Sequence, residues 1–341
     1  MVVVTFGILV LLMVTAIMVA RMRNLWAAVM ATGIFSFLGA CWMMLLDAPD
    51  VSFTEAAVGA GISTVLMLST LALVGKQEIA CKVKLIPLLT VTLTGVALVY
   101  GTLDMPMYGD ANAPIHLYPS PGYVEKSMHE MHGLPNVVTS VLASYRGFDT
   151  LGETMVVFTA GIGALLILMG DPKSLHAVEP ARINQGGLKM RDFLIIRVVT
   201  KMLIPFIIMF GLYVQFHGDY GPGGGFQAGV IVASAFILYG LVFGLDATQR
   251  VAPKRIVEKF LALGLMIYAG TGFLTVLLGA QYLDYNLLEH HWMTEHHVPS
   301  GQHLGIFMVE LGVGLTVTAV MITIYYAFAG RRPAVCLPLR F

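Results

Sequence analysis

The chain has 341 residues, of which 57% are hydrophobic and only 12% are charged. A soluble globular protein of ordinary composition carries about 25% charged residues, so the composition excludes that class. The 20 basic and 20 acidic side chains balance, and this neutral charge offers no basic surface for nucleic acid. The composition therefore predicts a chain that spends most of its length in a lipid bilayer.

Long apolar runs recur from one end of the chain to the other, which is typical of transmembrane helices. The pattern predicts an all-α, polytopic membrane protein with about nine spans. The expected spans are residues 2–20, 25–46, 51–74, 85–103, 148–170, 193–214, 226–245, 258–280 and 302–328.

The segments between these spans predict the orientation of the chain. Sixteen of the 20 basic residues lie in one alternating set of segments, and the other set holds only Lys126 and Arg146. Because Lys and Arg concentrate in cytoplasmic loops, we expect the N-terminus outside and the C-terminus in the cytoplasm. A segment rich in proline and glycine, residues 171–191, is the expected linker between five spans and four.

One outer loop, residues 104–147, is long enough to hold a helix of its own. Within it, residues 132–145 carry Leu134, Val137, Val138, Val141 and Leu142 at helical spacing. This spacing predicts an amphipathic helix with these side chains on its apolar face. The helix either lies on the outer surface or folds back into the membrane.

Two acidic residues stand just inside outward-facing span starts. Glu55 follows Pro49 in the third span, and Glu153 belongs to the stretch Arg146-Gly147-Phe148-Asp149-Thr150-Leu151-Gly152-Glu153 that opens the fifth. A charge at the bilayer centre costs about 2.5–3.5 kcal/mol on insertion scales, so an intramembrane acid is a functional candidate. Asp149 shares a helix face with Glu153.

A structural alternative exists for both glutamates. Ser52-x-x-Glu55 and Thr150-x-x-Glu153 match the capping box, in which the acid bonds back to the cap amide. Because Pro49 prefers the first helical turn, Glu55 is expected too deep for a cap, and an ionisable site is favoured there. For Glu153 the cap and the ionisable site stay open.

Further ionisable residues accompany the last four spans. Lys201 either snorkels to the interface or acts as a buried cation. Glu310, eight residues into the last span, makes a packing hydrogen bond or has a functional role. His217 and Asp219 are expected at the interface, with proton entry as the alternative.

Glycine is concentrated at the start of the seventh span, in Gly221-Pro222-Gly223-Gly224-Gly225-Phe226-Gln227-Ala228-Gly229. The Lys-Ser/Thr pair of a P-loop is missing. Close helix packing is therefore favoured, and an irregular backbone that lines a cavity is the alternative.

Neither a metal site nor a cofactor is predicted. The loop 281–301 contains His290, His291, His296 and His297, which are ligand types for Zn²⁺ or Cu²⁺. Adjacent histidines point apart on a helix, however, so they indicate metal binding only weakly. The sequence also lacks a catalytic triad or a cofactor fingerprint, and predicts ion movement or scaffolding instead of enzymatic chemistry.

Three of these stretches together resemble components of Mrp-type multisubunit Na⁺/H⁺ antiporters. Residues 1–80, with Ala48-Pro-Asp-Val-Ser-Phe-Thr-Glu, resemble the MbhD-like module of the MrpA subunit. Residues 81–170, with Arg146–Glu153, resemble the MbhE-like module that follows it. Residues 192–341, with Pro222-Gly-Gly-Gly-Phe-Gln, resemble the MrpB (MnhB) subunit.

The resemblance implies a component of a bacterial inner-membrane complex that exchanges Na⁺ for H⁺ together with other membrane subunits. It also implies that Glu55 and Glu153 lie on the cation or proton route. The large antiporter-like domain of MrpA is absent from this sequence, so transport by this chain alone is not expected. One alternative is the corresponding component of a membrane-bound hydrogenase or related respiratory complex. A scaffold whose glutamates only cap helices is another.

Overall fold

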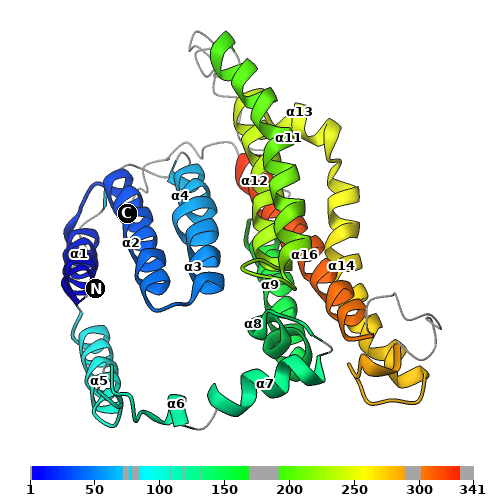
Figure 1. The fold of residues 1–341 in the computed structure, drawn as a ribbon. Coiled ribbons are helices and arrows are strands. Elements are labelled where there is room, and N and C mark those ends of the chain that lie inside the picture. Colours follow the sequence, from blue (N-terminus) through cyan, green and yellow to red (C-terminus); the bar gives the residue numbers. More distant parts are fainter. Residues whose placement is uncertain are drawn as a thin grey trace.

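The computed structural model describes residues 2–71, 77–78, 84–107, 109–117, 120–131, 133–168, 192–288 and 301–330 (Figure 1). Within these ranges the regular structure is helical, apart from one isolated bridge between Asn24 and Gln77. Nine of the described helical segments are long and apolar enough to cross a membrane. The predicted all-α, nine-span architecture is confirmed.

The first three spans form one group of neighbouring helices. They are α1 (Val2–Arg21), α2 (Leu25–Leu45) and a continuous third span made of α3 (Pro49–Glu55), η1 (Ala56–Ser63) and α4 (Thr64–Leu71). Asn24 caps α2, since its Oδ1 accepts the amides of Trp26 and Ala27 at 3.0 and 3.3 Å. Pro49 lies in the first turn of α3, as expected.

The fourth span, α5 (Leu85–Thr102), is exposed at every position. It leads to a segment with α6 (Pro114–Leu117), α7 (Ser120–Glu130), α8 (Val137–Thr139) and η2 (Ser140–Tyr145). A mostly apolar helix exposed all round needs lipid or another protein chain beside it. We therefore expect the fourth span to contact lipid or another protein chain.

The helix predicted at residues 132–145 exists, but it begins at Val137, and part of its apolar face is exposed. Thr139, Ser140 and Ala143 are buried, whereas Val138 and Leu142 are 41% and 44% exposed. Thr139 faces the glycine-rich loop, where its hydroxyl donates to the Gly218 carbonyl, and Ser140 donates to the Asn136 carbonyl of its own segment. The segment therefore packs on the protein through its polar face.

The remaining five spans form a bundle in which the last helix is central (Figure 1). The bundle consists of α9 (Gly147–Leu168), α11 (Leu194–His217), α12 (Gly225–Phe243), α14 (Lys254–Leu277) and α16 (Gly301–Ala329), with the short α13 (Leu245–Val251) between α12 and α14. The other four spans all contact α16, whose Ile306 and Val317 are fully buried. Small residues permit this: a β-carbon on Gly264 would lie 2.5 Å from the carbonyl oxygen of Gly312.

The ends of the helices differ from the predicted spans by a few residues. The largest shift is in α14, which begins at Lys254 and not at residue 258. Charged residues in this first turn extend the helix beyond its apolar run, which hydropathy alone does not detect. The predicted linker 171–191 lies outside the described residues.

Candidate functional site

A cavity of about 330 Å³ lies between the third span and the bundle. Three carboxylates line it from three separate helices: Asp50 of α3, Glu153 of α9 and Glu310 of α16. The other polar side chains on its wall are Thr54, Thr139, Thr150, Thr154, Gln227 and Tyr268. We call this space the acidic cavity.

The glycine-rich loop between α11 and α12 wraps around the carboxyl group of Glu310. A β-carbon on Gly218 would lie 2.8 Å from Glu310 Oε2, and one on Gly224 would lie 3.3 Å from Glu310 Oε1. Gly224 has a φ of +126°, a conformation that favours glycine. Glycine at positions 218 and 224 therefore leaves space for the Glu310 carboxyl group, which a residue with a side chain would occupy.

The same glycines bring α12 against α16. A β-carbon on Gly225 would lie 2.1 Å from the carbonyl oxygen of Glu310 and 3.0 Å from the amide nitrogen of Gly314. Gly223, Gly224 and Gly225 also line the acidic cavity. The two interpretations of this motif, close packing and a cavity-lining backbone, thus describe one segment.

Asp50 fixes the glycine-rich loop to the third span. Its Oδ1 accepts the Gly223 amide at 3.1 Å. The side chain of Gln227 donates to Thr54 Oγ1 at 2.9 Å and to the Asp50 carbonyl at 3.4 Å. Asp50 lies in the first turn of α3, where the helix dipole favours a carboxylate. Asp50 is not among the residues predicted from the sequence, although an acid next to the helix-starting Pro49 was the available signal.

The capping-box interpretation is wrong for both glutamates. Helix α9 begins at Gly147, so Thr150 is already inside it, and its hydroxyl donates to the Leu142 carbonyl at 2.7 Å. Ser52 likewise lies inside α3, and its hydroxyl donates to the Ala40 carbonyl at 2.7 Å. Neither hydroxyl accepts an amide at a helix start.

The structure does not bring Glu55 and Glu153 onto the same cavity. Glu55 ends α3 where the π-helix η1 begins, and it faces α2. A β-carbon on Gly59 would lie 2.5 Å from Glu55 Oε1 and 2.7 Å from Ser36 Oγ, which locates the carboxyl group between these helices. Glu55 does not line the acidic cavity. It directly precedes a π-helical segment, and such segments are frequent at functional sites.

Within the stretch that opens α9, only Glu153 and Thr150 reach the acidic cavity. Arg146 Nη2 and Asp149 Oδ2 form an exposed ion pair at 2.5 Å. Gly147 is buried, and its carbonyl accepts the hydroxyl of Tyr268 at 2.7 Å. Arg146, Gly147 and Asp149 therefore shape the start of α9.

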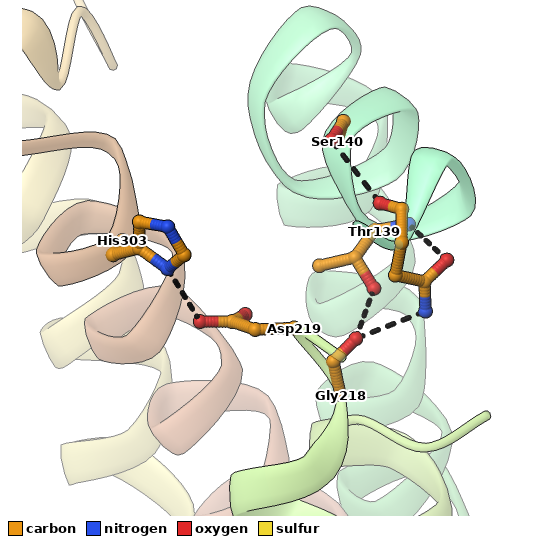
Figure 2. Close-up of polar contacts among 6 residues, drawn as sticks. Thr139, Ser140, Gly218, Asp219 and His303 are labelled. Carbon is orange, nitrogen blue, oxygen red and sulfur yellow. Dashed lines mark hydrogen bonds and ion pairs between the residues drawn. The ribbon is translucent and has the colours of Figure 1, made fainter. Parts of the chain in front are cut away.

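A network of hydrogen bonds joins the glycine-rich loop to α8 and α16 (Figure 2). The Gly218 carbonyl accepts Thr139 Oγ1 at 2.7 Å and Asn136 Nδ2 at 2.9 Å. Asp219 Oδ2 pairs with His303 Nδ1 of α16 at 3.2 Å. Burial raises the pKa of Asp219, and the hydrogen bond and charge of His303 oppose this rise. Asp219 thus lies beside the glycine that contacts Glu310.

Two predicted candidates lie elsewhere. The His217 ring stacks on Tyr213 with 5.0 Å between centroids. Lys201 is exposed, and its Nζ lies 5.6 Å from the ring centroid of Phe243, at the opposite end of α12 from the glycine-rich loop. Neither side chain lines the acidic cavity.

The remaining predicted residues are Pro222 of the glycine-rich loop and the four histidines of the weakly indicated metal site. Pro222 is exposed beside the cavity glycines. His290, His291, His296 and His297 lie outside the described residues. Within the described ranges, no group of three or more His, Cys, Asp or Glu residues is arranged to hold a metal ion.

Two family models match the chain. The domain related to the MnhB subunit of Na⁺/H⁺ antiporters matches residues 195–323, and the MbhD domain, named for the D component of MBH, matches residues 10–76. The acidic cavity thus includes Asp50 from the MbhD match and Glu310 from the MnhB match.

Two curated relatives show how these domains are distributed. The putative antiporter subunit mnhB2 of Staphylococcus haemolyticus is 36% identical over 138 residues, which are 40% of this chain and 94% of the relative. The probable A/B component of a K⁺/H⁺ antiporter of Rhizobium meliloti is 26% identical over 271 residues. The alignment with this second relative covers 72% of the chain but only 26% of the relative's length.

Solved structures share the fold. The Mrp complex from Dietzia sp. DQ12-45-1b contains a chain with a TM-score of 0.74 and 23% identity, matched over 95% of this chain and 34% of that one. The membrane-bound sulfane sulfur reductase, an archaeal respiratory membrane complex, contains one with a TM-score of 0.51 and 28% identity, matched over 70% of this chain and 96% of that one. The chain belongs to the MnhB family of antiporter subunits and carries an MbhD domain ahead of the MnhB domain, as an Mrp-type fusion of MrpA-like and MrpB-like segments.

Proposed function

We propose that this chain is the part of a multisubunit cation/proton antiporter that holds an ion route in the acidic cavity. The observation that carries the proposal is that Asp50, Glu153 and Glu310 line the same cavity among membrane-spanning helices. Intramembrane acids of this kind mark ion and proton pathways. The ions are a monovalent cation, Na⁺ or K⁺, and H⁺, as the names of the relatives suggest.

We assign a different role to each of the three carboxylates. Asp50 is bonded to Gly223 and orders the loop. The carboxyl group of Glu310 lies against glycine on the cavity wall, where a proton or a hydrated cation can reach it. Glu153 lines the same cavity and is exposed, so we assign to it the connection between the cavity and its surroundings.

The chain works with partner proteins, and it spans the bacterial inner membrane several times. Helix α5 is exposed along its length, which supports a site for other antiporter subunits beside it. The orientation that we propose places the cavity end of the bundle outside, because Lys and Arg gather in the segments at the other end. The modules 1–80, 81–170 and 192–341 remain our proposed division of the chain.

The test is exchange by the assembled complex in everted membrane vesicles. We expect Glu310→Gln to lower the dissipation of ΔpH by Na⁺, Li⁺ and K⁺ by about tenfold or more, because an amide cannot exchange a proton. Complex assembly is measured in parallel by co-purification of the partner proteins, so that lost exchange is not confused with lost protein.

The matched control is Glu258→Gln, which removes an exposed glutamate of α14 that pairs with Lys254 at 3.7 Å. It should leave exchange unchanged. Full exchange by assembled Glu310→Gln complexes would rule out this carboxyl group as part of the ion route.

A second candidate function is favoured by the likeness to a chain of the archaeal sulfur reductase. In that case the same cavity would serve a redox-driven complex. Purifying the native complex distinguishes the two, because a redox module would co-purify and ΔpH dissipation by added cations would be absent.

A further inference from the structure

A second cavity, of about 320 Å³, faces α11 and α14 instead of α3 and α9. Its wall is apolar over most of its extent, with Phe236 of α12, Ile256 and Phe260 of α14, and Leu315 of α16 among the lining side chains. We call it the apolar crevice. It shares no lining residue with the acidic cavity.

Small residues form the floor of the crevice. A β-carbon on Gly211 would lie 2.7 Å from Val232 Cγ2, and one on Gly229 would lie 2.7 Å from the carbonyl oxygen of Gly314. These contacts draw α11 and α16 close to α12. Gly211, Gly229 and Gly314 all line the crevice.

One buried polar group in the crevice lacks a partner. Gln215 is 7% exposed and lines the crevice, and its Nε2 donates no hydrogen bond within the described part of the chain. The other polar side chain on the wall, Thr318, donates its hydroxyl to the Gly229 carbonyl at 3.0 Å. A buried donor without an acceptor is costly, so the crevice is suited to a ligand that is apolar along its length and carries one acceptor.

We propose that the crevice binds one acyl chain of a membrane phospholipid, whose ester carbonyl accepts the Gln215 amide. Gln215 lies two residues before the end of α11, about 3 Å along the axis. A helix of 24 residues is about 36 Å long and exceeds the hydrocarbon core of about 30 Å. Its ends therefore reach the interfacial region, where the ester groups of phospholipids lie.

The length and the volume of the crevice both fit a single chain. From Leu311 to Ile322 of α16 the apolar path is about 16 Å long, at 1.5 Å per residue. An extended acyl chain can follow a path of this length, and the crevice of about 320 Å³ has room for one.

The test compares ester-linked with ether-linked phospholipid of the same headgroup and chain length. Native mass spectrometry of the assembled complex measures how much of each lipid stays bound. We expect the wild type to favour the ester by roughly threefold to tenfold, which is what one neutral hydrogen bond supplies. In Gln215→Leu this preference should disappear, and in Ile256→Trp, which fills the crevice, both lipids should be lost.

The control variant is Gln281→Leu, which removes an exposed glutamine outside the crevice. It should keep the ester preference. Equal retention of ester and ether by the wild type, or an ester preference that survives in Gln215→Leu, would overturn the proposal. Retention of both lipids by Ile256→Trp would show that the bound lipid lies elsewhere.

Discussion

At the scale of single residues, the structure separates acids that look alike in the sequence. Glu55, Glu153 and Glu310 are each isolated in an apolar run, yet only Glu153 and Glu310 line the acidic cavity. The distinction depends on helix rotation, since neighbouring positions on a helix face directions about 100° apart.

Asp50 allows its structural and ionic roles to be separated. Asp50→Ala removes the acceptor for the Gly223 amide and should lower the free energy of unfolding by about 1–3 kcal/mol. Asp50→Asn keeps an acceptor and should retain most of that stability while it lowers cation exchange. Thermal unfolding in detergent and vesicle exchange measure the two effects. If Asp50→Asn exchanges like the wild type, the charge of Asp50 is not part of the ion route.

Asp219 predicts a pH dependence of stability. Burial raises its pKa above the ordinary value of 3.8, so the folded chain holds this proton more tightly than the unfolded chain. The stabilisation from this group is full below pH 3.8 and is lost as the pH rises through the folded pKa.

The measurement is the unfolding midpoint of wild type and Asp219→Asn in detergent, from about pH 3 to about pH 7. As the pH rises, we expect the unfolding midpoint of the variant to increase relative to that of the wild type. The wild-type carboxyl group becomes charged while buried, whereas an amide stays neutral. A difference between the two midpoints that stays constant over this range would contradict the expectation.

At the scale of elements, close contacts between helices determine where the cavities form. Three helices approach through glycine: α12 meets α16 at Gly225 and Gly229, and α14 meets α16 at Gly264. The third span adds a π-helical segment directly after Glu55. Gly225 lines the acidic cavity and Gly229 lines the apolar crevice, so both cavities lie beside such a contact.

Gly225→Ala tests the contact between α12 and α16. The added β-carbon would lie 2.1 Å from the Glu310 carbonyl oxygen, and backbone on both sides leaves no flexible atom to move. We expect a loss of about 1–3 kcal/mol or more, measured as a lower unfolding midpoint. Gly163→Ala is the matched control, since nothing lies within 4 Å of its β-carbon; it should be neutral or slightly stabilising. Equal midpoints for the two variants would disprove the tight contact.

At the scale of the whole molecule, exposed apolar surface is the dominant feature. Helix α5 and much of α1 are exposed, as is expected of spans that face lipid or other proteins of a complex. The bundle around α16 supplies the core, and the first three spans join it through Asp50, Thr54 and Gln227. The acidic cavity exists only where these two groups meet.

The proposed orientation is tested by single-cysteine labelling with a membrane-impermeant reagent in intact cells. Gln281→Cys and Asp246→Cys replace exposed residues that lie at opposite ends of α14. We expect label at position 281 and protection at position 246 until the cells are opened. The reverse pattern would invert the topology.

The sequence by itself determined the class of the protein, the number of spans and the family. Long apolar runs are local signals, and the same is true of the Pro49 helix start and of the glycine motif at residues 221–229. Local patterns also singled out Glu153 and Glu310, because a lone acid in an apolar run is conspicuous without any knowledge of its neighbours.

Only the tertiary structure decided which of these residues belong together. Asp50 acquires its role from an amide 173 positions away, Lys201 and His217 fall outside the cavity, and the helix at residues 137–145 buries its polar face. Each outcome depends on contacts between distant segments, where the packing of backbone on glycine outweighs the preference of any single segment. Helix rotation and the pairing of buried polar groups are properties of the assembled bundle.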